Sequence, residues 1–250
     1  MRLTVLGSGA SYPGAGHACA GHVVEHDGAA ILLDCGNGVL ANLAKLMDPT
    51  RLAAVFVTHA HIDHFADVYA LQAALRWAPE GPCPPLDIHL PPGLFERLGA
   101  MLTARGTVEL AEAFRPHDIV AGRQVSVGPF AIVAAEVDHL SPTFALRVSV
   151  GQSVLVYTSD TATGPAVTAA VRGADVIIAD ATLPPGYEGR APHLSPALSA
   201  TLAEEAGAHT LVLSHLWPTV DREAAAREAG ERFAGRVIVA DELDTIDIDS

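Results

Sequence analysis

Residues 58–64 have the sequence THAHIDH, in which three histidines and one aspartate stand close together. The apolar run at residues 53–58, AAVFVT, leads into this segment and predicts a short buried strand. Apolar residues at helical spacing over residues 64–77 predict a helix after it. The polar segment is therefore expected on a loop that joins a strand to a helix.

The spacing of these polar side chains is typical of a metal site. In an extended segment, residues i and i+2 point the same way, so His59 and His61 can reach one metal ion. Asp63 and His64 lie one turn further along the chain and can reach a second ion nearby. Imidazole nitrogen and carboxylate oxygen both suit Zn²⁺, and no sulfur ligand is needed. A solvated histidine-rich loop is the alternative, and the position directly after a buried strand argues against it.

The hydrophobic pattern of the remaining chain predicts an α/β fold. Short strands are predicted at residues 3–6, 21–26, 30–34, 86–90, 124–127, 131–137, 144–150, 154–158, 176–179, 210–213 and 236–239. Helices are predicted at residues 37–46, 94–104, 165–171, 195–206 and 221–233. Each half of the chain begins with strands and continues with alternating strands and helices, which favours two packed sheets with helices outside. No linker divides the sequence, so residues 1–250 are expected to form a single domain.

The composition excludes several classes of protein. Of the 250 residues, 50% are hydrophobic, so the chain has enough apolar material for a packed core and is not a disordered protein. Its 15 Lys+Arg against 29 Asp+Glu give a net charge of −14, which argues against stable nucleic-acid binding. Three cysteines without CxxC spacing predict reduced thiols rather than disulfides or a cysteine-ligated zinc site. The sequence shows no secretory signal and no apolar run of about 18 residues, so we expect a cytoplasmic protein that does not enter a membrane.

The H-x-H-x-D-H motif and the order of the later motifs resemble the metallo-β-lactamase superfamily along nearly the whole chain. The resemblance implies a four-layer αββα sandwich, the metallo-β-lactamase fold. It also implies a third histidine, a bridging aspartate and a late histidine, each at the end of a strand. The matching residues are His139 in VDHLSPTFALRV, Asp160 in VYTSDT and His215 in LVLSHLWP. The implied ligands of the first metal are His59, His61 and His139, those of the second are Asp63, His64 and His215, and Asp160 bridges the two.

Residues beyond the ligands also match the superfamily. Asp34, in LLDCGNG, stands where members carry an aspartate that accepts hydrogen bonds and orients a ligand; a plain strand-to-helix cap is the alternative. His193, in APHLSPALSA, resembles the non-ligand histidine that assists leaving-group protonation in the ribonuclease Z branch; a histidine without a catalytic role is the alternative. In that branch a glutamate supports this histidine, whereas the equivalent residue here is Asp180, one methylene shorter. Ser195 is expected to cap the following helix.

An aspartate at the bridging position resembles the phosphodiesterase and thioesterase branches of the superfamily. It implies two cations held close together, with a metal-bound hydroxide as the nucleophile. Ribonuclease Z shares the motif order and the PTFALRV stretch, but its tRNA-gripping arm lies between the third histidine and the bridging aspartate. Here only residues 140–159 separate these two positions. Residues 193–248 resemble bacterial members described as cyclic-nucleotide phosphodiesterase-like.

These features predict a binuclear metal-dependent hydrolase, a phosphodiesterase that acts on a small (cyclic) nucleotide. Two Zn²⁺ ions are the expected cofactors, and Mn²⁺ would also suit these ligands. The alternatives are a tRNA 3′-processing endonuclease without the arm, a thioesterase or lactonase with the same metals, and a non-catalytic metal-binding scaffold. A homodimer is expected from the resemblance, because many relatives pair.

Overall fold

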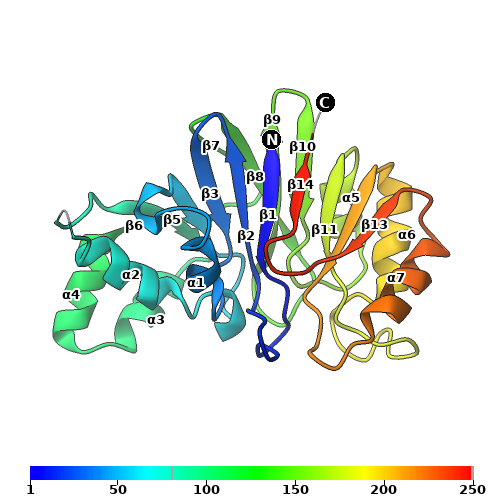
Figure 1. Cartoon of the computed structure of the whole chain (residues 1–250), viewed down its shortest axis with the longest axis horizontal. Helices are drawn as coiled ribbons and strands as arrows, with labels where there is room; N and C mark the ends of the chain where they lie inside the picture. The colour runs from blue at the N-terminus through cyan, green and yellow to red at the C-terminus, as the bar shows by residue number, and fades with distance from the viewer. Residues whose placement is uncertain (80, 249–250) are drawn as a thin grey trace.

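Two seven-stranded β-sheets face each other in the computed structural model, which describes residues 1–79 and 81–248 (Figure 1). Helices cover the outer face of each sheet, on the left for one sheet and on the right for the other (Figure 1). The layers therefore run helix, sheet, sheet, helix. The four-layer sandwich predicted from the sequence is confirmed.

The first sheet takes the N-terminal half of the chain and one strand from its C-terminal end. Its strands, in spatial order, are β14 (Thr245–Asp247), β1 (Arg2–Gly7), β2 (Gly21–His26), β3 (Ala29–Leu33), β4 (Ala54–Phe56), β5 (Leu86–Leu90) and β6 (Phe114–Asp118). Neighbours from β14 to β3 are antiparallel, and those from β3 to β6 are parallel. On its outer side lie α1 (Val39–Leu43), α2 (Val68–Arg76), α3 (Leu94–Ala100) and α4 (Ala104–Ala113), with 3-10 turns η1 (Pro49–Arg51) and η2 (Ile62–His64) in the connections.

The second sheet repeats this plan with the other half of the chain. Its strands, in spatial order, are β13 (Arg236–Val239), β12 (Thr210–Ser214), β11 (Val176–Asp180), β10 (Ser153–Tyr157), β9 (Thr143–Val150), β8 (Phe130–Val137) and β7 (Gln124–Val127). Neighbours from β13 to β10 are parallel, and those from β10 to β7 are antiparallel. The helices α5 (Pro165–Val171), α6 (Pro196–Ala206) and α7 (Arg222–Gly230) cover it. Within the described chain, no helix has the length and hydrophobicity needed to cross a membrane.

Three apolar cores separate the four layers. The central core lies between the sheets and takes side chains such as Leu3, Ile31, Phe130 and Leu146 from both. The two outer cores fill the space between each sheet and its helices. Because the inner strands are buried on both faces, they have continuous apolar sequences rather than alternating ones, as in AAVFVT.

The carboxyl ends of β3 and β4 meet those of β8, β10, β11 and β12 at one edge of the sandwich. Hydrogen bonds join the two sheets there: the Phe144 N–H donates to the Thr58 carbonyl at 3.1 Å, and the Tyr157 hydroxyl donates to Asp34 at 2.8 Å. Side chains that follow these strands are therefore brought into one region, although they are far apart in the sequence.

The helix predicted over residues 64–77 begins later than expected. The turn η2 ends at His64, and α2 begins only at Val68. Tertiary contacts fix the intervening backbone, because the Cys35 N–H donates to the His64 carbonyl at 2.8 Å. A side chain at Gly36 would collide with the carbonyl oxygen of Asp63, so this close approach needs glycine.

Some elements were not predicted from the sequence. The helix expected over residues 94–104 is two helices, because the Thr103 side chain accepts a hydrogen bond from the Gly106 N–H and caps α4. The strand β6 has the sequence FRPHD, in which proline and charged residues are unusual for a central strand. It forms the edge of the first sheet, where proline needs no partner for its missing N–H. The short strand β14 was also missed.

His22 is a buried histidine of β2 whose two ring nitrogens have no hydrogen-bond partner among the described residues. Its ring packs edge-on against Tyr157, with 5.1 Å between the centroids. Burial lowers the pKa of His22 to about 4, whereas an unfolded histidine has a pKa near 6.5. The unfolded state therefore binds this proton first as the pH falls, and stability present above about pH 6.5 is lost towards pH 4.

We expect the substitution His22→Phe to remove this part of the acid sensitivity. Between about pH 7 and pH 5, the free energy of unfolding should fall by about 2 kcal/mol less in the variant than in the original chain. Urea titrations at the two pH values measure the difference. His26→Phe, at the less buried end of the same strand, is the matched control. An identical pH dependence in His22→Phe and the original chain would contradict the expectation.

Candidate metal centre

Seven candidate metal ligands converge where the two sheets meet. They are His59, His61, Asp63 and His64 after β4, His139 after β8, Asp160 after β10 and His215 after β12. Every candidate ligand named from the sequence lies in this cluster. His61 and His139 are half-buried, and the other five residues are buried.

One group consists of His59, His61 and His139 together with one oxygen of Asp160. The Nδ1 atom of His61 lies 3.0 Å from His59 Nε2 and 3.3 Å from His139 Nε2. The Oδ2 atom of Asp160 lies 3.5 Å from His59 Nε2 and 3.7 Å from His139 Nε2. One potential ligand atom from each of the four residues lies within 4.8 Å of the others.

The second group consists of Asp63, His64 and His215. The Nε2 atoms of His64 and His215 are 3.2 Å apart. The Oδ2 atom of Asp63 lies 3.3 Å from His215 Nε2 and 3.7 Å from His64 Nε2. The backbone N–H of Ser11 donates to the same oxygen at 2.6 Å, so the first loop of the chain holds this carboxylate in place.

Asp160 lies between the two groups and presents a different oxygen to each. Its Oδ1 atom lies 3.4 Å from His64 Nε2 and 3.4 Å from His215 Nε2, whereas Oδ2 faces the first group. The Oδ1 atom is buried and has no hydrogen-bond partner in the described chain. A buried carboxylate oxygen in this state requires compensation, and a cation would supply it.

The spacing of the donor atoms fits divalent cations. Zn²⁺ binds imidazole nitrogen and carboxylate oxygen at about 2.0–2.2 Å in tetrahedral sites, which places the ligand atoms about 3.3–3.6 Å apart. The distances given above for the two groups, from 3.0 to 3.7 Å, lie around this value, and all the atoms of each group lie within 4.8 Å of one another. The residues present therefore fit metal ions both in chemistry and in spacing.

Asp34 orients one of the candidate ligands. Its Oδ2 atom accepts a hydrogen bond from His64 Nδ1 at 2.7 Å and from the Tyr157 hydroxyl at 2.8 Å. Its Oδ1 atom accepts the Thr58 N–H at 2.7 Å. A carboxylate of this kind fixes the proton on Nδ1, so the Nε2 lone pair of His64 faces the cluster. These contacts favour a role for Asp34 in orienting His64 over that of a plain strand-to-helix cap.

His139 and His215 are oriented in a similar way. The Nδ1 atom of His139 lies 3.0 Å from the carbonyl oxygen of Pro192, which can only accept a hydrogen bond. The Nδ1 atom of His215 lies 2.7 Å from the Thr182 hydroxyl, which donates in turn to Asp180 at 2.6 Å. In both residues Nε2 faces the cluster. Thr182 and Tyr157 were not predicted from the sequence, because no local motif marks either residue.

The electrostatics of the two groups differ. Burial lowers the pKa of His59 to about 4 and also lowers the pKa of His61 and of His139, so these rings are neutral near pH 7. In the second group burial opposes protonation, but Asp160 and the neighbouring carboxylates raise the pKa of His215 to about 10 and that of His64 well above its usual value. The close carboxylates thus favour positive charge at this position.

Several residues of the site adopt a backbone conformation that is unusual for residues with a side chain. Four of the six non-glycine residues with positive φ in the described chain are here: Ser11 (63°), Asp34 (60°), Ser159 (55°) and His215 (55°). Such conformations cost free energy, so they persist only where surrounding contacts hold them. Four such residues thus lie at the edge where the candidate ligands gather.

Known proteins resemble this chain in sequence and in fold. A family model described as a beta-lactamase superfamily domain matches residues 29–216. The chain belongs to the metallo-β-lactamase superfamily. A probable metallo-hydrolase of Bacillus subtilis (strain 168), YhfI, is 27% identical over 96% of this chain and 97% of its own. The crystal structure of YhfI aligns with a TM-score of 0.88 and 25% identity over 98% of both chains.

Two further similarities concern ribonucleases. A protein of Mycobacterium sp. (strain KMS) named ribonuclease Z is 30% identical over 99% of this chain and 96% of its own. The short form of human tRNase Z aligns with a TM-score of 0.80 and 23% identity over the full length of both chains. This member of the superfamily is accordingly a hydrolase of a metal-dependent family, and its histidine and aspartate clusters could hold divalent metal ions.

His193 and Asp180 lie beside the candidate ligands in this superfamily member. The Nδ1 atom of His193 donates to Asp180 Oδ2 at 2.8 Å, so the shorter carboxylate does reach the ring. The Thr161 N–H and the Thr182 N–H also donate to Asp180, which fixes its position. The His193 ring centroid lies 4.9 Å from that of His139. Burial alone would lower the pKa of His193, but the hydrogen bond to Asp180 outweighs this effect and raises the pKa above its usual value.

Two other clusters of potential ligands occur in the described residues. One consists of Asp160, Asp180, His193 and His215, and overlaps the site above. Asp180 is already engaged by backbone and hydroxyl donors, so its oxygens are not free for a metal. The other, His17 with Asp241 and Glu242, lies mostly at the surface.

The Ser195 side chain caps α6 by accepting a hydrogen bond from the Leu198 N–H, as predicted from the sequence.

We expect Asp34→Asn to weaken metal binding without removing a ligand. An amide cannot accept all the hydrogen bonds that the carboxylate receives, so His64 loses its fixed orientation. The affinity for the more weakly bound cation should fall by about 10–100-fold. Competition with a chelating indicator measures it. Asp118→Asn, an exposed change of the same kind, is the control, and equal affinities in both variants would contradict the role given to Asp34.

Proposed function

We propose that the chain is a binuclear metal-dependent phosphodiesterase that hydrolyses a small (cyclic) nucleotide. His59, His61 and His139 hold one cation, and Asp63, His64 and His215 hold the other. Asp160 bridges the two. The observation that carries the proposal is the position of Asp160, whose two oxygens face different groups of ligands.

Divalent cations at these positions would acidify a water molecule near neutral pH and offset the negative charge that grows on a phosphate in the transition state. The chain contributes the fixed geometry. Hydrogen bonds that the ligand rings donate to Asp34, Pro192 and Thr182 hold these rings in place before any substrate binds. Such preorganised groups need no rearrangement during the reaction.

His193 is proposed as the proton donor to the leaving oxygen. Asp180 binds its Nδ1 atom, so Nε2 is the nitrogen that can meet a substrate. The same carboxylate keeps the ring protonated to higher pH than an isolated imidazole, as general-acid catalysis near neutral pH requires. His193 is half-buried beside the ligands, which keeps it within reach of a bound phosphodiester.

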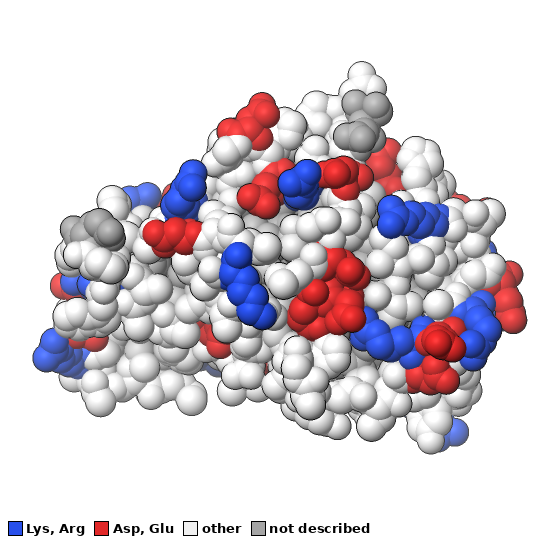
Figure 2. Space-filling model, in the orientation of Figure 1, with Lys and Arg blue, Asp and Glu red and all other residues white. Residues whose placement is uncertain are grey.

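A small substrate is favoured over a folded RNA. The hairpin of β9 and β10 accounts for most of residues 140–159, where the resemblance places the tRNA-gripping arm of ribonuclease Z. Basic and acidic side chains are interspersed on the face in Figure 2, and no continuous basic surface is visible there. The net charge is −14, whereas a protein that grips a polynucleotide presents clustered Lys and Arg. The second candidate is nevertheless a tRNA 3′-processing endonuclease, because a relative 30% identical is named ribonuclease Z.

A substrate panel with metal analysis of the same sample tests the proposal. Bis-p-nitrophenyl phosphate, 3′,5′-cyclic AMP, a precursor tRNA, a thioester and a chromogenic β-lactam are compared on protein loaded with Zn²⁺ or Mn²⁺. We expect two cations per chain and turnover of the first two compounds. Cleavage of the precursor tRNA in preference to them would favour the endonuclease. Turnover of acyl substrates alone would reject the phosphodiesterase, and no turnover with two bound cations would indicate a scaffold.

A further inference from the structure

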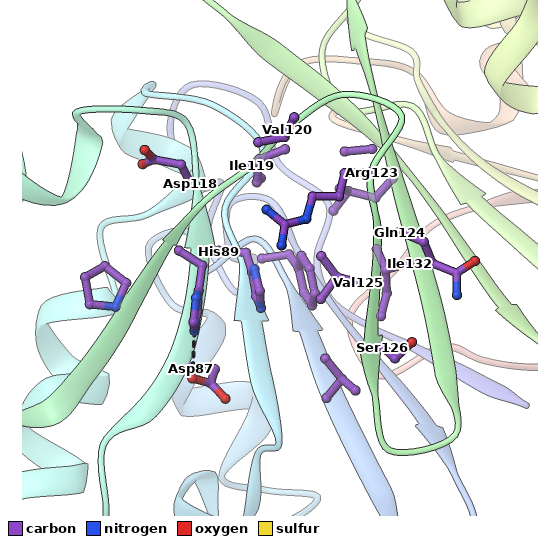
Figure 3. A pocket seen from close by; sticks show the side chains of 16 residues that line it. Asp87, His89, Asp118, Ile119, Val120, Arg123, Gln124, Val125, Ser126 and Ile132 are labelled. Carbon is purple, nitrogen blue, oxygen red and sulfur yellow. Dashed lines mark hydrogen bonds and ion pairs between the residues drawn. The ribbon is translucent and has the colours of Figure 1, made fainter.

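A cleft separates the free edges of the two sheets, between β6 and β7 (Figure 3). We propose that it is a second ligand-binding site, for a planar aromatic molecule that carries an anionic group. Its volume is about 770 Å³, within the range of roughly 300–1,000 Å³ that is usual for small-molecule sites. None of the candidate metal ligands lines it, so the proposal does not depend on the function of the metal centre.

Three stacked rings form part of the wall of this cleft. Phe56, His89 and His117 are neighbours across β4, β5 and β6. The centroids of Phe56 and His89 are 4.4 Å apart with an interplanar angle of 8°, and those of His89 and His117 are 4.7 Å apart at 20°. Buried aliphatic side chains, among them Ile132 and Leu146, form another part of the lining. A flat ring gains both apolar burial and aromatic contacts on such a surface.

His89 supplies a polar group inside this apolar surface. It is only 7% exposed, and its ring is stacked between those of Phe56 and His117. Burial, together with His117, lowers the pKa of His89 to about 4, so the ring is neutral near pH 7. A neutral imidazole offers one N–H donor and one acceptor, the pair of groups that a heteroaromatic ligand can satisfy.

Arg123 supplies the charge. Its guanidinium group extends into the cleft in Figure 3, and no carboxylate of the described chain forms an ion pair with it. Asp87 is engaged by Arg115 at 3.0 Å and by His117 at 2.9 Å, and the carboxylate of Asp118 turns away from the cleft (Figure 3). The charged side chain that can meet a ligand in the cleft is therefore the guanidinium of Arg123, and its positive charge favours an anionic ligand.

A small molecule suits the cleft better than an added β-strand. Pro116 interrupts the row of N–H groups on β6, and Arg115 and Asp118 place charges along the same short edge. Features of this kind prevent strands of other chains from pairing with a sheet edge. The cleft therefore remains open beside an edge that disfavours strand addition.

Fluorescence titration with 1-anilinonaphthalene-8-sulfonate, an anion with a flat naphthalene ring system, tests the site in the full chain. We expect saturable binding at about one site per chain. Arg123→Glu should weaken binding at least about tenfold, because it reverses the charge that meets the sulfonate. Val125→Trp, which places a large side chain into the cleft, should weaken it similarly.

Arg97→Glu is the matched control, because Arg97 is an exposed arginine of α3 that does not line the cleft. Binding by this variant should equal that of the original chain. The proposal would be overturned by an absence of saturable binding, or by equal weakening in Arg97→Glu and Arg123→Glu. Light scattering that detects a dimer, which Val125→Trp dissociates, would overturn it as well, because a second copy of the chain would then fill the cleft. Arg123→Glu keeps the test decisive if Val125→Trp fails to fold.

Discussion

Asp160→Ala is expected to leave fewer than two cations per chain and to lower phosphodiester turnover by at least about a thousandfold. The side chain is buried, and its two oxygens lie between 3.4 and 3.7 Å from ligand nitrogens of both groups. In the variant, His64 and His215 lose a carboxylate that raises the pKa of both rings. Protons should then bind less tightly to these two rings, and a metal ion should bind less tightly to the group of Asp63, His64 and His215.

Metal analysis by mass spectrometry and steady-state kinetics measure both effects. Asp160→Asn preserves the size of the side chain and shows whether the loss follows from charge rather than from a cavity. Circular dichroism establishes that each variant is folded, and Asp118→Ala, an exposed position, serves as the control. Full metal content together with near-normal turnover in Asp160→Ala would refute the bridging role.

His193→Ala is expected to keep both cations and to lower kcat by about 10²–10⁴-fold, the usual contribution of a general acid. His193 binds Asp180 rather than the ligand cluster through Nδ1, so its removal leaves the ligand set intact. The matched control is His209→Ala, a histidine beside Asp175 at the surface, with 3.7 Å between the paired atoms. Loss of a cation from His193→Ala would show that His193 is a ligand.

The pH dependence of kcat separates proton donation from a structural role. Asp180 raises the pKa of His193 by stabilising its protonated form, against the effect of burial. In Asp180→Asn the pKa should fall, so the proton is lost at lower pH and the alkaline limb of the profile moves towards acid. An alkaline limb that stays in place in Asp180→Asn would argue against His193 as the acid.

Much of the fold could be predicted because its signals are local. The run AAVFVT and the THAHIDH loop place a buried strand before a polar turn, and both features lie within a few residues of each other. The later ligands follow apolar strands in the same way. Their grouping into two sites came from the resemblance, since spacing alone does not show which strand ends meet.

The residues that support the ligands could not be predicted, because their contacts join distant parts of the chain. Tyr157 and Asp34 are 123 positions apart, and Thr182 is 33 positions from His215. The edge strand β6 was missed for a related reason. Its sequence FRPHD is typical of a loop, and only its place beside β5 makes it a strand.

The number of cations needed for turnover tests the central claim most directly. The metal-free protein is titrated with Zn²⁺ or Mn²⁺ while bound metal and hydrolysis of bis-p-nitrophenyl phosphate are followed on the same sample. We predict binding of two equivalents, with turnover that appears only as the second is bound. Full turnover with a single equivalent, or two bound equivalents without phosphodiester hydrolysis, would contradict the account.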